Sequence, residues 1–310
     1  MLGALVGDAA GATLEFVGRP IDDEMARTAM RMPGRGRLRV GPGQITDDGE
    51  LTLALWSALR DGRPADITKD IVDAYVEWFN SCPFDIGYTC CNAFETFSEM
   101  PLDDAIRAIS ELNATSEANG ALMRASAIPA WAVMLPGGDE RAVHAASVAK
   151  LDATLSHPSE VCQLCNSIYV YAVTHLMMGK SPAEVLAHTD EFVKGLAASA
   201  AASKVSAWYF EESRDIGHLD STKLIGHVRY GFVFAFYFLR NPDISFEDAI
   251  RMTLMKGGDT DTNAAIVGGM VGSYQTIPEY MLEPVMKFDV AASGFGHERP
   301  LRFCARSLRG

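Results

Sequence analysis

A helix with an acidic start is predicted by the stretch Lys256-Gly257-Gly258-Asp259-Thr260-Asp261-Thr262-Asn263-Ala264-Ala265-Ile266-Val267-Gly268-Gly269. The two leading glycines allow a sharp turn, and the small residues that follow favour close packing against neighbouring helices. Two carboxylates this close repel each other and favour a bound cation. Oxygen-only ligands favour a hard ion such as Mg2+, Ca2+ or Mn2+. A cluster of N-capping Asp and Thr side chains explains the same residues equally well.

A second acidic cluster opens an apolar segment far upstream, at Thr46-Asp47-Asp48-Gly49-Glu50. Capping explains one such cluster, but two clusters in one chain indicate the halves of one site. Brought together, they offer four carboxylates, whose repulsion about two divalent cations would relieve. The predicted metal ligands are Thr46, Asp47, Asp48, Asp259, Asp261 and Thr262.

Composition narrows the class of protein. The 310 residues, 48% of them hydrophobic, suffice for one large domain or two ordinary ones. A net charge of −13 argues against non-specific binding to nucleic acid or anionic membranes, which requires a basic surface. No run reaches the ~18 apolar residues of a membrane span, and the N-terminus has no basic leader of a signal peptide. The dispersed cysteines indicate a reducing compartment, and we expect a cytoplasmic protein. We also expect a monomer.

The N-terminal segment, residues 2–16, is predicted to be a helix. Gly3, Gly7 and Gly11 are four residues apart and form a smooth stripe that another backbone can approach. Asp8 and Glu15 are seven residues apart and therefore lie on one side, two turns apart. These acids either face a cation or pair with arginines, and the burial implied by the glycine stripe favours a site.

Apolar residues recur at spacings of three and four along most of the chain, and strand signals are scarce. Helices are predicted at residues 66–80, 87–98, 102–112, 140–154, 158–178, 182–203 and 227–240, with others beginning near 119, after Ser245 and beyond Pro278. No low-complexity linker intervenes, and the acidic clusters belong to opposite ends of the chain. We therefore predict an all-α fold, one compact multi-helix domain over residues 1–310.

Three further segments have two interpretations each. Asn119-Gly120-Ala121-Leu122-Met123-Arg124 can form a turn whose amides bind an anion at a helix start, although this signal alone is weak. His157 precedes Pro158 at the start of a helix, where it is either a structural residue or a ligand contact. Residues 17–45 form a loop that can meet phosphates or an acidic partner, or is a solvated connection. Its basic residues include Arg31, Arg35, Arg37 and Arg39.

Five motifs occur in order along nearly the whole chain: Gly3-Ala4-Leu5-Val6-Gly7-Asp8-Ala9-Ala10-Gly11 through Glu15, Thr46-Asp47-Asp48, Asn119-Gly120-Ala121-Leu122-Met123-Arg124, Ser156-His157-Pro158 and Gly257-Gly258-Asp259-Thr260-Asp261-Thr262. In these motifs the sequence resembles the ADP-ribosylglycohydrolase family. The resemblance implies an all-helical fold with a binuclear metal cleft that holds two Mg2+ or Mn2+ ions. The implied ligands match the six residues already predicted.

The resemblance also implies the activity: metal-dependent hydrolysis of the C1'' glycosidic bond between ADP-ribose and a protein side chain or small acceptor. The expected binding partners are ADP-ribose and ADP-ribosylated proteins or small molecules, not a membrane. The expected catalytic residues are Glu15, Asp47 and Asp261. The expected ligand-binding residues are Asp8, Ser116, Asn119, Gly120, Met123, Arg124, His157, Gly257 and Gly258.

An alternative is a catalytically silent relative that binds ADP-ribose or has a structural role. The acidic motifs favour the enzyme. Two residues support the silent alternative. Gly49 stands where the family commonly carries Thr or Ser, and Glu117 places a carboxylate beside the expected pyrophosphate, which it would repel.

Overall fold

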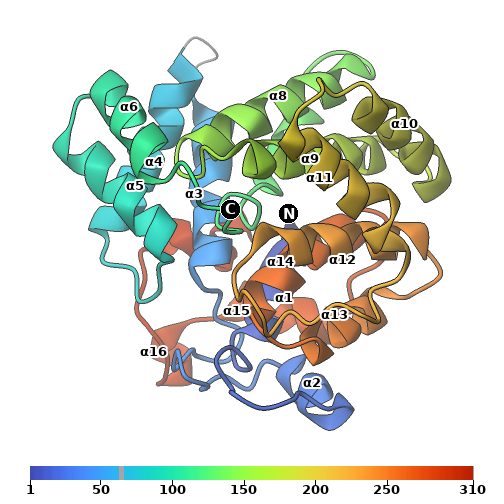
Figure 1. Cartoon of the computed structure of the whole chain (residues 1–310). Coiled ribbons are helices and arrows are strands. Elements are labelled where there is room, and N and C mark those ends of the chain that lie inside the picture. The colour runs from blue at the N-terminus through green and yellow to red at the C-terminus, as the bar shows by residue number, and fades with distance from the viewer. Residues whose placement is uncertain (63–65, 310) are drawn as a thin grey trace.

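Two helices of small residues from opposite ends of the sequence pack against each other at the centre of the fold (Figure 1). They are α1 (Leu2–Gly11) and α14 (Thr260–Val271). A Cβ atom added to Gly7 would lie 1.9 Å from the Ala264 carbonyl oxygen, and one added to Gly11 would lie 2.4 Å from the Asp261 Cα atom. The glycine stripe is therefore required for this close approach, which brings Asp8 and Asp261 together.

The computed structural model describes residues 1–62 and 66–309. Within these ranges the fold is a single compact helical domain, and extended pairing is limited to the isolated bridges Arg35–Val40 and Ala118–His227. None of the described helices is long and apolar enough to cross a membrane. The other elements are α2 (Asp23–Ala29), α3 (Asp47–Asp61), α4 (Ile67–Asn80), α5 (Tyr88–Glu99), α6 (Leu102–Leu112), α7 (Ala127–Ala132), α8 (Glu140–Thr154), α9 (Glu160–Met177), α10 (Pro182–Lys194), α11 (Ala200–Phe210), η2 (Glu212–Arg214), α12 (Val228–Arg240), α13 (Phe246–Met255), α15 (Glu279–Lys287), α16 (Val290–Ser293), η3 (Leu301–Phe303) and η4 (Ala305–Arg309).

One continuous hydrophobic core joins α1, α3, α9, α12 and α14. The side chains of α9 are buried almost throughout its length, and the aromatic helix α12 buries four phenylalanines. The aromatic helix is thus part of the core. The serine predicted to begin α13 does so, because Ser245 Oγ accepts a hydrogen bond from the Asp248 N–H at 3.1 Å.

Three predicted helices differ from the observed ones. The helix predicted at residues 2–16 ends at Gly11, and the chain turns to Phe16, whose φ is 56°. The helix predicted at 182–203 is two helices, because Ser199 starts α11 by accepting a hydrogen bond from the Ala202 N–H at 2.9 Å. The segment after Asn119 forms turns, and α7 begins only at Ala127.

Candidate active site

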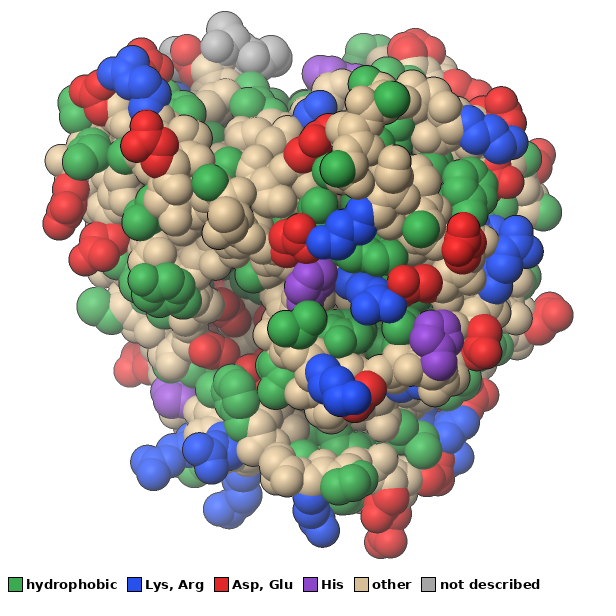
Figure 2. All heavy atoms as spheres, in the orientation of Figure 1, with side chains coloured by type: hydrophobic (Ala, Val, Ile, Leu, Met, Phe, Trp, Pro, Cys, Tyr) green, Lys and Arg blue, Asp and Glu red, His purple; other side chains and the backbone are tan. Residues whose placement is uncertain are grey.

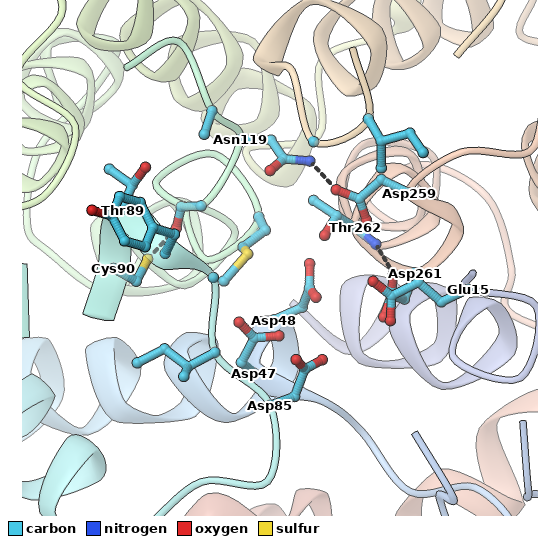
Figure 3. A pocket seen from close by; sticks show the side chains of 18 of the residues that line it. Glu15, Asp47, Asp48, Asp85, Thr89, Cys90, Asn119, Asp259, Asp261 and Thr262 are labelled. Carbon is cyan, nitrogen blue, oxygen red and sulfur yellow. Dashed lines mark hydrogen bonds between the residues drawn. The ribbon is translucent and has the colours of Figure 1, made fainter. Parts of the chain in front are cut away.

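A cavity of about 310 Å³ lies where α3 and α14 begin, walled also by the loops before α5 and α7. Figure 2 shows a hollow in this face with acidic side chains inside it, and Figure 3 shows the carboxylates pointing into a common space. Six carboxylates line the cavity: Glu15, Asp47, Asp48, Asp85, Asp259 and Asp261. Its other wall residues include Phe16, Tyr88, Asn119, Gly120, Met123, His157, Ile225 and Thr262.

Helix capping does not account for the two acidic clusters. Thr46 and Asp259 occupy the N-cap positions of α3 and α14, but neither side chain accepts a hydrogen bond from its own helix. Asp8 of α1 instead caps α3, accepting the N–H of Thr46 at 3.0 Å and that of Gly49 at 2.9 Å. The Thr46 hydroxyl lies 2.9 Å from Asp8 and 3.1 Å from Asp48, so it joins the carboxylates.

The arrangement of oxygen atoms fits a pair of hard cations. Carboxylate oxygens of Asp8, Asp48 and Asp261 lie within 4.8 Å of one another, as do those of Glu15, Asp85 and Asp261. Glu15 Oε2 and Asp48 Oδ1 are buried and have no hydrogen-bond partner among the described residues. Unpartnered buried carboxylate oxygens are costly unless a cation compensates them, and an all-oxygen donor set suits Mg2+ or Mn2+.

Burial and mutual repulsion raise the pKa values of five carboxyl groups, those of Glu15, Asp47, Asp48, Asp85 and Asp261. The pKa of Asp48 lies well above its usual value because of burial and then of Asp47, and that of Asp261 because of burial and then of Glu15. Burial, with Asp259 and Asp85 next, raises the pKa of Glu15 to about 9. Within the described residues no lysine or arginine pairs with the six carboxylates of the cavity. Positive charge must therefore come from a bound species if all are to ionise at neutral pH.

The loop at Asn119 forms the opposite wall. The side chain of Asn119 donates a hydrogen bond to Asp259 at 2.7 Å, which couples this wall to the acidic cluster. Its backbone N–H donates to the Gly226 carbonyl at 2.9 Å, so this one amide of the predicted anion-binding turn is engaged within the fold. His157 is buried, and burial lowers its pKa to about 3, so the imidazole facing the cavity is neutral.

Arg124 lies behind this wall. It is fully buried, and its guanidinium donates to the carbonyl of Gly120 at 2.9 Å, to Ser156 Oγ at 2.8 Å and to Asp152 at 3.1 Å. Arg124 thus fixes the loop that carries Gly120 to the end of α8. This position corrects our expectation that the side chain faces the ligand, because the loop itself separates it from the cavity.

Three other residues that were expected to bind the ligand, Ser116, Gly257 and Gly258, also lie away from the acidic cavity. The Ser116 hydroxyl lies 2.9 Å from Thr89 Oγ1 and ties its loop to the start of α5. Gly257 and Gly258 have φ values of 72° and 71° and line a separate, larger cavity. In contrast, Asn119, Gly120, Met123 and His157 all line the acidic cavity.

The two residues that suggested a silent protein are both accommodated. A Cβ atom on Gly49 would lie 2.6 Å from Asp8 Oδ2, so a glycine matches the close approach of α1 to α3. The Glu117 carboxylate pairs with Lys204 at 2.5 Å and with His227 at 3.0 Å. Its charge is therefore compensated outside the cavity.

Four residues of the cavity wall were not predicted from the sequence: Asp85, Tyr88, Phe16 and Ile225. Asp85 lies in the loop before α5 and joins Glu15 and Asp261. The side chains of Tyr88, Phe16 and Ile225 are 81%, 51% and 55% exposed at the mouth of the cavity. Asp85 has no acidic neighbour in the sequence, so the close repulsion that marked the other motifs is missing there. The Gly87-Tyr88 pair at a predicted helix start was the one local sign of this part of the wall.

Comparisons with known proteins agree with this geometry. The model of the ADP-ribosylglycohydrolase family matches residues 1–301. A protein of Acanthamoeba polyphaga mimivirus, whose name assigns it provisionally to the ADP-ribosyl glycohydrolases, is 29% identical over 92% of this chain and 89% of its own. The ADP-ribosylarginine hydrolase Tri1 of Serratia proteamaculans is 26% identical over 93% and 74%. A solved structure titled ADP-ribosylglycohydrolase-related protein complex has the same fold, with a TM-score of 0.68, 24% identity and coverage of 91% and 90%.

Proposed function

This chain belongs to the ADP-ribosylglycohydrolase family, and from that membership we propose that it hydrolyses the C1'' glycosidic bond that joins ADP-ribose to arginine. The observation that carries the proposal is the convergence of two groups of carboxylates on Asp261, with Glu15 beside it. Capping of α3 accounts for Asp8 alone, and no described lysine or arginine pairs with the other carboxylates of the two groups. A hydrolytic centre that requires cations explains the convergence.

We propose that Mg2+ or Mn2+ is held by Asp8, Asp48 and Asp261, whose carboxylate oxygens lie within 4.8 Å of one another, with Asp47, Asp259, Thr46 and Thr262 as the further ligands predicted from the motifs. When bound, two such cations would hold the ribose hydroxyls and stabilise the charge that develops as the glycosidic bond breaks. The orphaned oxygen of Asp48 supports this assignment. The close approach of α1 to α14 supplies the rigid frame that metal ligands need.

Glu15 is the residue placed to move a proton. It stands on the turn after α1, and its carboxylate faces the cavity beside Asp85 and Asp261. In its ionised form it can take the proton of the water that attacks C1'', a role that typically contributes about 10²–10⁴-fold in rate. Its second oxygen, which lacks a hydrogen-bond partner among the described residues, is available for this role.

Charge balance favours arginine as the acceptor. The six carboxylates of the cavity wall and Asp8 carry seven negative charges when all are ionised, and two divalent cations neutralise four of them, which leaves three. Glu15 and Asp85 form a pair of carboxylates that a planar guanidinium can contact with several N–H donors. A neutral serine or acetyl acceptor would leave this charge uncompensated. The name of the Serratia relative, an ADP-ribosylarginine hydrolase, points to the same acceptor.

The opposite wall is proposed to hold the rest of ADP-ribose. Gly120, Met123 and neutral His157 face the cavity from this side. A neutral imidazole can donate or accept one hydrogen bond without adding charge. We also propose that Arg124 acts by holding the Gly120 loop in position.

The test is release of ADP-ribose from an ADP-ribosyl-arginine peptide, an ADP-ribosyl-serine peptide and O-acetyl-ADP-ribose. We expect wild type to prefer the arginine peptide at least tenfold in kcat/KM. Asp85→Asn should reduce that preference, Glu15→Gln should slow every substrate, and Asp243→Asn, an exposed acid elsewhere, should change neither. Equal rates on serine or O-acetyl substrates would contradict the acceptor, and release from none would contradict the hydrolase.

Three further features remain predictions: the monomeric state, the cytoplasmic location and the extent of the domain over residues 1–310. Size-exclusion chromatography with light scattering tests the first. A mass near 33.6 kDa is expected.

A further inference from the structure

A second cavity of about 680 Å³ adjoins the acidic cleft. Phe16 and Ile225 line both cavities, so the two spaces are neighbours. The walls of the second are the segments 14–21, 220–225 and 255–258, which present mainly apolar side chains. Those side chains are Leu14, Phe16, Val17, Ile21, Ile225 and Met255.

We propose that this second cavity binds the polypeptide that carries the ADP-ribose, receiving an apolar side chain from an acidic segment next to the modified residue. The inference rests on the proposed hydrolysis of ADP-ribosyl-arginine. It adds a binding site for the flanking peptide and predicts the type of protein sequence that the enzyme favours.

The position of the cavity supports this occupant. Phe16 follows Glu15 directly, and Gly257 and Gly258 directly precede Asp259, so the second cavity begins where the reaction centre ends. An acceptor bonded at C1'' must leave the acidic cleft beside Glu15. A peptide attached to that acceptor then meets the second cavity, whose volume is in the usual range for binding pockets.

The boundary between the two cavities exposes large apolar side chains. Phe16 is 51% exposed, Ile225 is 55% exposed and Leu224 is 72% exposed. The backbones of Phe16 and Leu224 have φ values of 56° and 51°, a strained conformation for such residues. Exposed apolar surface costs free energy, and an apolar side chain bound against Phe16 and Ile225 would recover part of it.

Charge selects an acidic peptide. Arg19 lines the second cavity and has no ion-pair partner among the described residues, while Asp220 there is neighboured by Lys223 at 3.4 Å. Gly36 approaches the residue before this wall, because a Cβ atom on Gly36 would lie 2.9 Å from the Cα atom of Thr13. Figure 2 shows basic side chains gathered at the lower left of this face and acidic ones at its lower right. Four exposed arginines occur in residues 17–45, although none of them lines the second cavity: Arg31, Arg35, Arg37 and Arg39.

The experiment compares three substrates: free ADP-ribosyl-arginine and two ADP-ribosyl-arginine peptides of equal length, one with Leu and Glu beside the arginine and one with Ser and Lys. Wild type should favour the acidic peptide at least tenfold in kcat/KM. Met255→Trp, which fills the cavity, and Arg19→Glu should each remove the preference and leave the free substrate within twofold. Met134→Trp is the control, since Met134 is 61% exposed and lies outside the cavity.

A measurement without turnover separates this inference from the proposed reaction. The acidic peptide with a diazirine-bearing leucine beside the arginine should crosslink to residues 14–21, 220–225 or 255–258, in wild type kept in EDTA and in Asp261→Asn. Crosslinks confined to other segments, or equal kcat/KM for both peptides, would overturn the inference even if free ADP-ribosyl-arginine is hydrolysed. Competition by single-stranded DNA but not by an acidic peptide would instead assign the basic edge to nucleic acid and also overturn it.

Discussion

The carboxylate of Asp8 on α1 accepts a hydrogen bond from the backbone N–H of Gly49 on α3, at 2.9 Å. An acid from one helix thereby caps the start of another, and Thr46 and Asp48 are drawn to the same point. Because α1 also packs against α14 through its glycines, Asp8 links the two acidic clusters. The site thus depends on the fit of three backbones.

Gly49→Ala is expected to destabilise the protein. The added Cβ atom would lie 2.6 Å from Asp8 Oδ2 and 2.8 Å from Ile45 Cβ, and overpacking of this kind costs about 1–3 kcal/mol. Urea unfolding measures the loss. Gly195→Ala is the control, because the nearest atoms to its Cβ lie at 3.4 Å and 3.5 Å. A Gly49→Ala protein as stable as wild type would contradict the proposed tight contact.

Asp48→Asn should stabilise the metal-free protein and abolish its stabilisation by metal. Burial and the charge of Asp47 oppose ionisation of Asp48, so an amide removes repulsion. Wild type should gain about 2.7 kcal/mol when Mn2+ is present at a hundred times its Kd, and the variant should gain little. Calorimetry in EDTA and in Mn2+ measures both effects, with Asp243→Asn as control. An unchanged response to Mn2+ in Asp48→Asn would argue against Asp48 as a ligand.

The acidic clusters were predictable because the sequence places carboxylates next to one another, where repulsion demands compensation. Sequence could not decide between cation binding and capping. The structure decides between the two because Asp8, from another helix, caps α3. The side chain of Thr46 therefore has no capping role. The α1 glycines predicted a close neighbour, but not that the neighbour is α14.

Other features depended on tertiary contacts with no local signal. The N-terminal helix ends at Gly11, where the chain meets α14, and Glu15 reaches the cavity from a turn. The break between α10 and α11 was hidden in an alanine-rich run of high helix propensity, which the Ser199 cap overrides. Asp85 stands alone in a loop, and only folding brings it to Glu15.

The metal-free protein should lose stability as pH rises. The pKa of Asp8 is raised to about 7 and that of Glu15 to about 9, both first by burial. The folded-state pKa values of both groups exceed those in the unfolded chain. At a pH between the unfolded-state and folded-state values, the folded protein therefore binds more protons than the unfolded chain. This stabilisation is present at low pH and is lost as pH rises through about 7 and then about 9.

Urea unfolding in EDTA at pH 5, 7 and 9 measures this loss. Glu15→Gln should reduce the part of the loss that falls between pH 7 and 9, because the amide does not titrate. Stability that stays constant or increases over this range would show that the carboxylates are ionised without a cation.

The buried pair of Arg124 and Asp152 should be essential for stability. Arg124→Met leaves the fully buried Asp152 carboxylate without its cation, and breaking a buried pair costs about 3–5 kcal/mol. The exposed pair of Arg107 and Asp104 is the control, since surface pairs contribute about 0–1 kcal/mol. Equal losses for Arg124→Met and Arg107→Met would contradict the assigned role of Arg124 in holding the Gly120 loop.

The central claim is that the carboxylates meeting at Asp261 form a hydrolytic centre that needs metal. The most direct measurement is release of ADP-ribose from an ADP-ribosyl-arginine peptide by wild type and Asp261→Asn, each in EDTA, Mg2+ and Mn2+. We expect release by wild type only with metal, and none by the variant under any condition although it remains folded. Release by wild type in EDTA, or by Asp261→Asn at the wild-type rate, would contradict the claim.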